Sequence, residues 1–306
     1  MRKDATPTES VAVITPKVLA RLPLPQPSED DDKEERGRVL VVGGSAEMPG
    51  AVILSAIAAL RAGAGKIQIA TAKSVAPHVG ASVPEGRVFG LRETKSGGIS
   101  SAAASQIAVY AASAQAVVIG PGMIDDASIK RLAEALLPCL GSRTVVVLDA
   151  GALGCLAANS DLLHGLRGNA VVTPHAGEMA KMCGLEKEAL AAGAAEAARE
   201  TARELRAVVA FKGRETYIAA PGSQVYCNRA GNVGLATSGS GDTLSGIVAG
   251  LAARGARPLA AAVWGVHLHA RAGDRLARRM GRLGFLAREL LAEIPPLMRE
   301  LQAKGK

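Results

Sequence analysis

Aromatic residues are scarce in this 306-residue chain, at 2% of positions, although hydrophobic residues make up 48%. The core must therefore be packed from Ala, Val, Leu and Ile, and few side chains remain on which nucleic-acid bases could stack. The formal net charge is +8, with Arg and Lys spread along the expected helices. This distribution is typical of a solvated basic face, and it also attracts anionic metabolites such as nucleotides. We therefore expect small-molecule ligands and no nucleic-acid partner.

Cysteine is also rare, and its positions show neither metal-ligand spacing nor the density of a disulfide scaffold. We expect Cys139, Cys155, Cys183 and Cys227 to be small buried hydrophobic residues. No run of eighteen apolar residues occurs, and the N-terminus lacks the apolar core of a signal peptide. The sequence therefore predicts a cytoplasmic protein with no membrane partner.

The beginning of the chain differs in composition from the rest. Proline and charged residues dominate positions 23–36, "PLPQPSEDDDKEER", and such a stretch cannot support a core. From Arg38 onward, short β-branched runs alternate with longer Ala/Leu-rich runs, the pattern of strands joined by crossover helices. We therefore predict an N-terminal arm at 1–36 and one domain at 37–306.

Six short runs are predicted to be strands, because several are continuously apolar, as in sheets buried on both faces. They span 38–44, 66–71, 116–122, 144–150, 170–175 and 207–213. Helices are predicted over 49–63 and 186–205 from helix propensity and from their start and stop residues. Segments 215–220 and 223–228 flank Pro221 and Gly222, which predicts a hairpin. The fold class is therefore α/β, with a mostly parallel central sheet and an appended β-hairpin.

Polar and glycine residues recur where the predicted strands end, and ligands of open parallel sheets bind at that edge. The sharpest segment is "TSGSGDTLSG", in which Gly239 and Gly241 precede an apolar helix whose first amides lack internal partners. Asp242 has two interpretations there. It is either a helix-terminal residue stabilised by the macrodipole or a base that takes a proton from a hydroxyl attacking a phosphate. The three preceding small residues favour the second, and no lysine follows the glycines as in a Walker loop.

These motifs resemble a known family. "SGSGD" before an apolar helix is similar to the anion-hole motif of the ribokinase-like superfamily. "GPGM", "VVLDAGAL", "VVTPHAGEMAKM", "FKGRET" and the glycine-rich segment together resemble the ADP/ATP-dependent NAD(P)H-hydrate dehydratases, from about Pro16 to about Leu290. The resemblance implies a ribokinase-like three-layer sandwich with helices on both faces of the sheet. It also implies a lyase for cofactor repair that converts the S-form of NADHX or NADPHX to NADH or NADPH, with ADP or ATP as phosphoryl donor and Mg²⁺.

The resemblance also assigns site residues. Asp242 would be the catalytic base and a substrate contact, with Ala51, Gly122 and His175 as further substrate contacts. Nucleotide binding would fall to Lys212, Gly213, Arg214, Glu215, Thr216, Gly239, Ser240 and Gly241. Glu178 would organise magnesium. Simpler interpretations stay open: a strand-end histidine that satisfies a loop carbonyl, a glutamate in the first turn of a helix near Gly177, and a solvated lysine at the end of a strand.

Three positions depart from the family pattern. Gly151 replaces a second aspartate of "LDADAL", Met123 and Ile124 stand in "GPGMI" where "GPGLG" is common, and Ser238 begins "SGSGD" where the family has glycine. The departures leave Asp242 in place and alter the walls around it. His267 and His269 lie two apart on a predicted helix and so on different faces, which argues against a joint metal site.

The sequence is also compatible with two other functions. One is a small-alcohol kinase of the same superfamily, such as a vitamin-precursor kinase, and the other is a nucleotide-binding sensor that has lost catalysis. The Ala-rich helices suit a homo-oligomer, and the resemblance implies a homotetramer. We expect no fused epimerase module, since the 36 residues ahead of the domain are too few to contain one.

Overall fold

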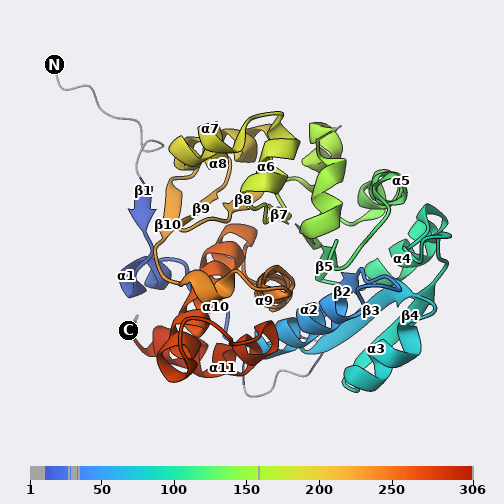
Figure 1. Ribbon diagram of the computed structural model, residues 1–306, viewed down its shortest axis with the longest axis horizontal. Coiled ribbons are helices and arrows are strands. Elements are labelled where there is room, and N and C mark those ends of the chain that lie inside the picture. Colours follow the sequence, from blue (N-terminus) through green and yellow to red (C-terminus); the bar gives the residue numbers. More distant parts are fainter. Residues whose placement is uncertain (1–10, 27, 29–32, 34, 158, 305–306) are drawn as a thin grey trace.

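The structure is a computed structural model that describes residues 11–26, 28, 33, 35–157 and 159–304. Over these residues ten strands form one sheet, in the order β1-β10-β9-β8-β7-β6-β5-β2-β3-β4 (Figure 1). Their bounds are β1 (Val11–Val13), β2 (Arg38–Val42), β3 (Lys66–Ala72), β4 (Gly86–Leu91), β5 (Ala116–Ile119), β6 (Val145–Leu148), β7 (Ala170–Val172), β8 (Val208–Phe211), β9 (Thr216–Ala219) and β10 (Val225–Asn228). Only β9 runs against its neighbours, because it pairs antiparallel with both β8 and β10.

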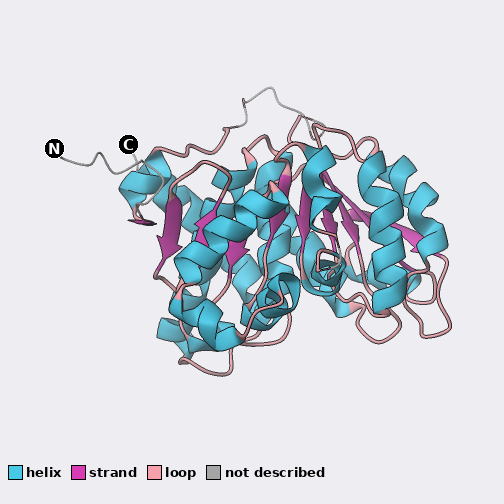
Figure 2. Cartoon of the chain, turned by 90° about the horizontal axis from the view of Figure 1, so that it is seen from above, coloured by secondary structure: helices cyan, strands magenta, loops and turns pink. Residues whose placement is uncertain are grey.

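Helices cover both faces of the sheet, as the view in Figure 2 shows. They are α1 (Pro16–Ala20), α2 (Gly50–Arg61), α3 (Ala76–Ser82), α4 (Ala104–Ala111), α5 (Asp126–Leu136), α6 (Ala176–Cys183), α7 (Lys187–Ala192), α8 (Ala194–Leu205), α9 (Ser240–Ala253), α10 (Pro258–Met280) and α11 (Ala287–Ala303). Alternate residues of β2 enter two separate cores. Val39 and Val41 belong to the core that α2, α9, α10 and α11 also line, whereas Leu40 and Val42 belong to the core lined by α4, α5 and α8. The predicted α/β fold with helices on both faces is confirmed.

The six predicted strands are present as β2, β3, β5, β6, β7 and β8, and the predicted hairpin is β9 and β10. Two edge strands were not predicted. β4 extends the sheet beyond β3, and β1, from the segment assigned to the arm, pairs parallel with β10. The helix predicted over 186–205 is wrong as a single element, because the chain interrupts it at Gly193 between α7 and α8.

The expectation that all four cysteines are buried is half right. Cys155 and Cys227 are buried, Cys139 is exposed and Cys183 is intermediate, and all four are free thiols. Exposure of Cys139 follows from its place in a short helical turn after α5, at the surface end of the connection to β6. Among the described residues, no helix is both long and apolar enough to cross a membrane.

Helices α2 and α9 pack unusually close together through small residues. A Cβ added at Gly246 would lie 2.1 Å from the Ser55 carbonyl oxygen, and one added at Gly250 would lie 2.4 Å from that of Ala59. Side chains at these positions would push the helices apart. Because α9 begins at Ser240, this contact also sets where the glycine-rich turn lies.

Gly246→Ala is therefore expected to destabilise the protein by about 1–3 kcal/mol, the usual cost of overpacking. The reason is the backbone carbonyl of Ser55, which cannot rotate away as a side chain would. Urea unfolding measures the change. Gly154→Ala is the matched control, because nothing lies within 4 Å of an added Cβ there. Equal stability of the two variants would contradict the close packing.

Candidate active site

A cavity of about 870 Å³ opens where β6, β7 and β8 end and α9 begins. Its walls come from the turns after these three strands, the ends of β9 and β10, the segment 230–237 that follows β10, the start of α9, and α10. The carboxyl edge of the sheet thus provides the charged end of the cavity. Val233, Leu235, Leu244 and Val266 provide an apolar end.

The first turn of α9 forms one wall of the cavity. Gly239 precedes it with φ of 85°, a left-handed conformation that glycine adopts without strain. Ser240, Gly241 and Asp242 line the cavity. The Ser240 amide donates to the Thr237 carbonyl at 3.2 Å, which leaves the amides of Gly241 and Asp242 free at the start of the helix. Such a turn binds anions, because the free amides and the helix dipole both favour negative charge.

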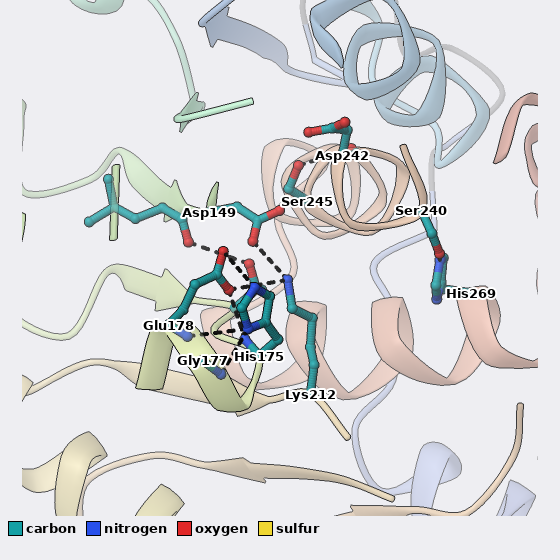
Figure 3. A network of polar contacts seen from close by, with 11 residues as sticks. Asp149, His175, Gly177, Glu178, Lys212, Ser240, Asp242, Ser245 and His269 are labelled. Atoms are coloured by element: carbon teal, nitrogen blue, oxygen red, sulfur yellow. Dashed lines mark hydrogen bonds and ion pairs between the residues drawn. The ribbon is translucent and has the colours of Figure 1, made fainter. Parts of the chain in front are cut away.

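A buried ion pair faces this turn from the end of β8. Lys212 Nζ lies 2.9 Å from Asp149 Oδ1 and 3.9 Å from Glu178 Oε2 (Figure 3). A Cβ added at Gly241 would lie 3.4 Å from Asp149 Oδ2 and 3.5 Å from Lys212 Nζ, so the pair touches the α9 turn. Burial lowers the pKa of the Lys212 ammonium, but Asp149 and Glu178 outweigh burial and hold that pKa above its usual value. Lys212 is therefore a fixed cation beside the free amides.

Asp242 occupies the third position of α9 and is half-buried. Burial first, and then the negative charge of Asp149, raise the pKa of its carboxyl to about 6, while Lys212 acts in the opposite direction. Figure 3 shows the carboxylate directed away from the Lys212–Asp149 pair and toward the ribbon of α2. The residue thus has the pKa and the position of a general base that accepts a proton near neutral pH.

His175 and Glu178 form a capping box at the start of α6. The amides of Gly177 and Glu178 donate to His175 Nδ1 at 3.0 and 3.2 Å, and the His175 amide donates to Glu178 Oε2 at 2.8 Å. His175 Nδ1 is therefore an acceptor, and the proton of the neutral ring lies on Nε2. The ring remains 60% exposed and lines the cavity. His175 and Glu178 thus cap α6, and both still line the cavity.

The structure gathers most of the predicted nucleotide residues in this cavity. Lys212, Gly213, Arg214, Thr216, Ser240 and Gly241 line it, whereas Gly239 lies just behind. Glu215, in the turn after β8, does not line the cavity. Its side chain faces the β9–β10 hairpin. Its carboxylate accepts a hydrogen bond from Tyr217 Oη at 2.8 Å and pairs with Arg229 Nε at 3.0 Å, and these contacts lower its pKa.

Two of the predicted substrate contacts lie outside the cavity lining but beside each other. A Cβ added at Gly122 would lie 2.8 Å from the Cβ of Ala51 and 2.5 Å from the Met48 carbonyl oxygen. Gly122 has φ of 65°. Ala51 is in the first turn of α2, and Leu54 of the same helix contacts Gly239 at the start of α9. The helix that carries Ala51 is therefore in contact with the turn that leads into Asp242.

Comparison with known proteins agrees with this arrangement. Residues 39–296 match the sequence model of the NAD(P)H-hydrate dehydratase family. The chain belongs to this family. The ADP-dependent (S)-NAD(P)H-hydrate dehydratase of Xanthomonas campestris is 46% identical over 292 residues, which cover 95% of this chain and 97% of that protein. The Bacillus subtilis protein of the same name is 30% identical over 92% of this chain and 96% of its own.

Solved structures show the same relationship. The ADP/ATP-dependent NAD(P)H-hydrate dehydratase of Bacillus subtilis, co-crystallised with ATP and Mg²⁺, superposes with a TM-score of 0.78 at 28% identity, over 96% of this chain and all of that chain. A ribokinase-like superfamily protein of Enterococcus faecalis gives a TM-score of 0.81 at 25% identity, over 95% of this chain and 96% of its own. The predicted family and the predicted ribokinase-like fold are both confirmed.

Two of the three departures from the family pattern contact each other. A Cβ added at Gly151 would lie 2.9 Å from the Met123 carbonyl oxygen and 3.4 Å from the Met123 Cβ. Met123 is buried, so in this chain the space beside residue 151 is filled from the turn after β5. Residues 123 and 151 are therefore neighbours in the fold. The third departure, Ser238, is exposed on the approach to α9.

Sequence reasoning did not assign several residues that the structure places at the site. Asp149, Asn228, Asn232 and His269 all line the cavity. For Asp149 the signal was a carboxylate directly after a continuous apolar strand, "VVVLDA". The spacing argument about His267 and His269 agrees with the structure, since His269 contacts Ser240 and His267 contacts Asn228. No local pattern marks His269 as a cavity residue, because its neighbour across the cavity is distant in sequence.

The residues present fit magnesium in one way only. In the described part of the chain, no three His, Cys, Asp or Glu side chains come together to hold a metal ion. A magnesium site whose ligands all come from protein side chains therefore does not fit. Mg²⁺ that is held mainly by nucleotide phosphates and waters needs one or two carboxylates, and Glu178, at the cavity wall with 19% of its side chain exposed, fits that role.

Proposed function

We propose that this protein dehydrates the S-form of NADHX or NADPHX to NADH or NADPH and couples this reaction to conversion of ADP to AMP and phosphate, with ATP as an alternative donor. Membership of the family and the ADP-dependent (S)-specific relatives support the reaction. The observation that carries the mechanism is Asp242, a half-buried carboxyl with a pKa of about 6 at an anion-binding helix start.

The hydrate has gained water across C5 and C6 of its dihydropyridine ring, so C6 bears a hydroxyl next to the ring nitrogen. Asp242 accepts the hydroxyl proton, and the oxygen attacks the terminal phosphorus of ADP, which releases AMP. The nitrogen lone pair then expels phosphate from C6, and loss of a proton from C5 restores the reduced ring. One hydrate and one ADP thus yield one NADH or NADPH, one AMP and one phosphate.

The remaining site residues bind and orient these groups. The amides of Gly239 and Gly241 and the Lys212 ammonium stabilise negative charge on the transferred phosphoryl group, whereas the Ser240 amide donates to the Thr237 carbonyl. Lys212, Gly213, Arg214, Glu215 and Thr216 form the nucleotide-binding turn. Ala51, Gly122 and His175 contact the hydrate; the His175 ring is 60% exposed, and its Nε2 lies 3.5 Å from Glu178 Oε1. Glu178 would hold Mg²⁺ through water, and the ion would neutralise phosphate charge.

Incubation of the purified protein with S-NADPH hydrate and ADP tests the proposal directly. Recovery of reduced-nicotinamide absorbance, with equal amounts of AMP and phosphate, supports the dehydratase. Phosphorylation of a different small alcohol, without hydrate turnover, would replace it with the kinase. Nucleotide-induced thermal stabilisation with no turnover of either would indicate a sensor. Parallel runs with ATP and with S-NADH hydrate define the preferred donor and substrate.

The pH profile provides a second test. A base with a pKa of about 6 is protonated below that pH, so kcat/KM is expected to rise with pH through about 6 and then level off. The Asp149 charge helps to raise this pKa, so Asp149→Asn is expected to move the acid limb to lower pH. Glu134→Gln, on the exposed side of α5, serves as the control and is expected to leave the limb in place. An unmoved limb in Asp149→Asn would contradict the electrostatic coupling.

We also propose that the protein is a cytoplasmic homotetramer. The large apolar side chains of Met280, Leu283 and Leu286 support association, because they are 47%, 74% and 44% exposed at the end of α10 and in its connection to α11. Light scattering after size-exclusion chromatography measures the subunit number. A monomer at micromolar concentration would contradict this assembly.

A further inference from the structure

His269 in α10 lies against the phosphate-binding turn, on the side away from the Lys212–Asp149 pair (Figure 3). Its Nε2 is 3.0 Å from Ser240 Oγ, and both residues line the cavity. Ser240 is 5% exposed and His269 is 9% exposed. A buried hydroxyl is thus paired with a buried imidazole at the first residue of α9.

The imidazole is neutral near pH 7. Burial first, and then the positive charge of Lys212, lower the pKa of His269 to about 4. A neutral ring engages the serine hydroxyl without adding a second cation to the site. Lys212 therefore remains the charge that the turn presents to a phosphate, and the histidine acts only through its hydrogen bond.

Ser240 is the first residue of α9, so the hydrogen-bond partner of its hydroxyl affects the amides at the start of that helix. A serine hydroxyl near the start of a helix readily accepts hydrogen bonds from nearby backbone amides. The Ser240 amide itself donates to the Thr237 carbonyl at 3.2 Å, so the amides that must stay free to bind phosphate are those of Gly241 and Asp242. A hydroxyl that is turned toward His269 leaves them free, whereas a released hydroxyl competes with the ligand for them.

We propose that His269 is a positioning residue of the nucleotide site, which holds the Ser240 hydroxyl away from the free amides of α9 and so keeps them open to the terminal phosphates of a nucleoside diphosphate. This inference rests on the proposed function, since it concerns the same phosphate-binding turn. His269 acts through Ser240 and not on the reacting atoms.

Isothermal titration with ADP and steady-state kinetics test this role. The Gln amide nitrogen reaches the place of imidazole Nε2 and the shorter Asn amide does not. We expect His269→Leu and His269→Asn to raise the Kd and KM for ADP about tenfold, the loss of one hydrogen bond. His269→Gln should stay within about threefold of wild type, and kcat at saturating ADP should change less than KM.

A second substitution separates positioning from packing. Ser240→Ala removes the competing hydroxyl, so adding it to His269→Leu is expected to restore most of the lost ADP affinity. Leu268→Val, at a fully buried neighbour in the apolar core, is the control: it should lower the thermal midpoint without changing the Kd. If His269→Leu does not fold, the same comparison uses His269→Asn with and without Ser240→Ala.

The outcomes are distinct. No ADP binding by the wild-type protein would overturn the proposed function itself. Normal wild-type binding, with His269→Leu and His269→Asn equal to wild type, would overturn only the role of His269. An unrecovered Kd in the double variant would show that His269 acts by packing, which also contradicts the inference.

Discussion

Asp242→Asn is expected to lower kcat by about 10²–10⁴-fold, the usual contribution of a general base, while the Kd for ADP changes little. The amide keeps the size of the carboxylate but cannot accept the proton of the C6 hydroxyl. The ion pair of Lys212 with Asp149 does not include Asp242, so the nucleotide contacts remain. Hydrate turnover and ADP titration on the same preparation measure both quantities.

The same substitution should stabilise the fold. Burial raises the pKa of Asp242 from 3.8 to about 6, so ionisation above pH 6 costs the folded state more than the unfolded state. Asparagine removes this cost, and the free energy of unfolding at pH 7.5 is expected to rise by about 1–3 kcal/mol. The gain should shrink as the pH falls from 6 toward 4, because the folded state then protonates the carboxyl.

Asp126→Asn is the matched control, since Asp126 also lies in the first turn of a helix but is exposed on α5. Its loss should cost about 0.3–1 kcal/mol of stability through the helix dipole and leave turnover unchanged. If Asp242→Asn behaved in the same way, Asp242 would be only a helix-terminal residue. The base would then have to be sought elsewhere in the cavity.

Lys212→Met is expected to have the second largest effect, on both stability and binding. Asp149 is 1% exposed, and loss of its partner leaves a buried carboxylate without compensation, which costs roughly 3 kcal/mol. The cation beside the amides of α9 is lost as well, so the Kd for ADP should rise at least about tenfold. Urea unfolding and calorimetric titration measure the two losses separately.

The double variant Lys212→Met with Asp149→Asn distinguishes the two effects. With the carboxylate gone, no charge remains buried alone, so stability should recover relative to Lys212→Met. ADP affinity should stay low, because the cation is still absent. Lys181→Met, at an exposed lysine on α6, controls for loss of charge in general. Recovery of ADP binding in the double variant would contradict a direct role of Lys212.

Much of the fold followed from local pattern. The runs "VVVL" and "AVVI" are continuously apolar because β6 and β5 are buried on both faces, and this requirement is visible in the sequence. The hairpin was marked by Pro221 and Gly222. β1 and β4 lacked such a signal: β1 is an apolar run of only three residues, and β4 is largely half-buried and has no continuous apolar run. Gly193 is not closely packed, yet the helix predicted over 186–205 from propensity is interrupted there.

Site residues that are close together in the chain could be predicted, and contacts between distant segments could not. The glycine-rich turn and Asp242 are neighbours in the chain, so one segment revealed both. Asp149 and Lys212 are separated by 63 residues, and their ion pair exists because β6, β7 and β8 lie side by side. The family resemblance supplied Lys212, but not the carboxylate that holds it. Glu215 was predicted with its turn, although its side chain faces the hairpin.

The sequence by itself determined the alternation of strand and helix, the family, and the glycine turn that ends in Asp242, because each depends on residues close together in the chain. Only the tertiary structure decided which charges meet. The raised pKa of Asp242, the Lys212–Asp149 pair and the contact of His269 with Ser240 depend on burial and on segments far apart in sequence. Parallel packing sets the distances between those segments, and electrostatic effects depend on distance and on exclusion of water.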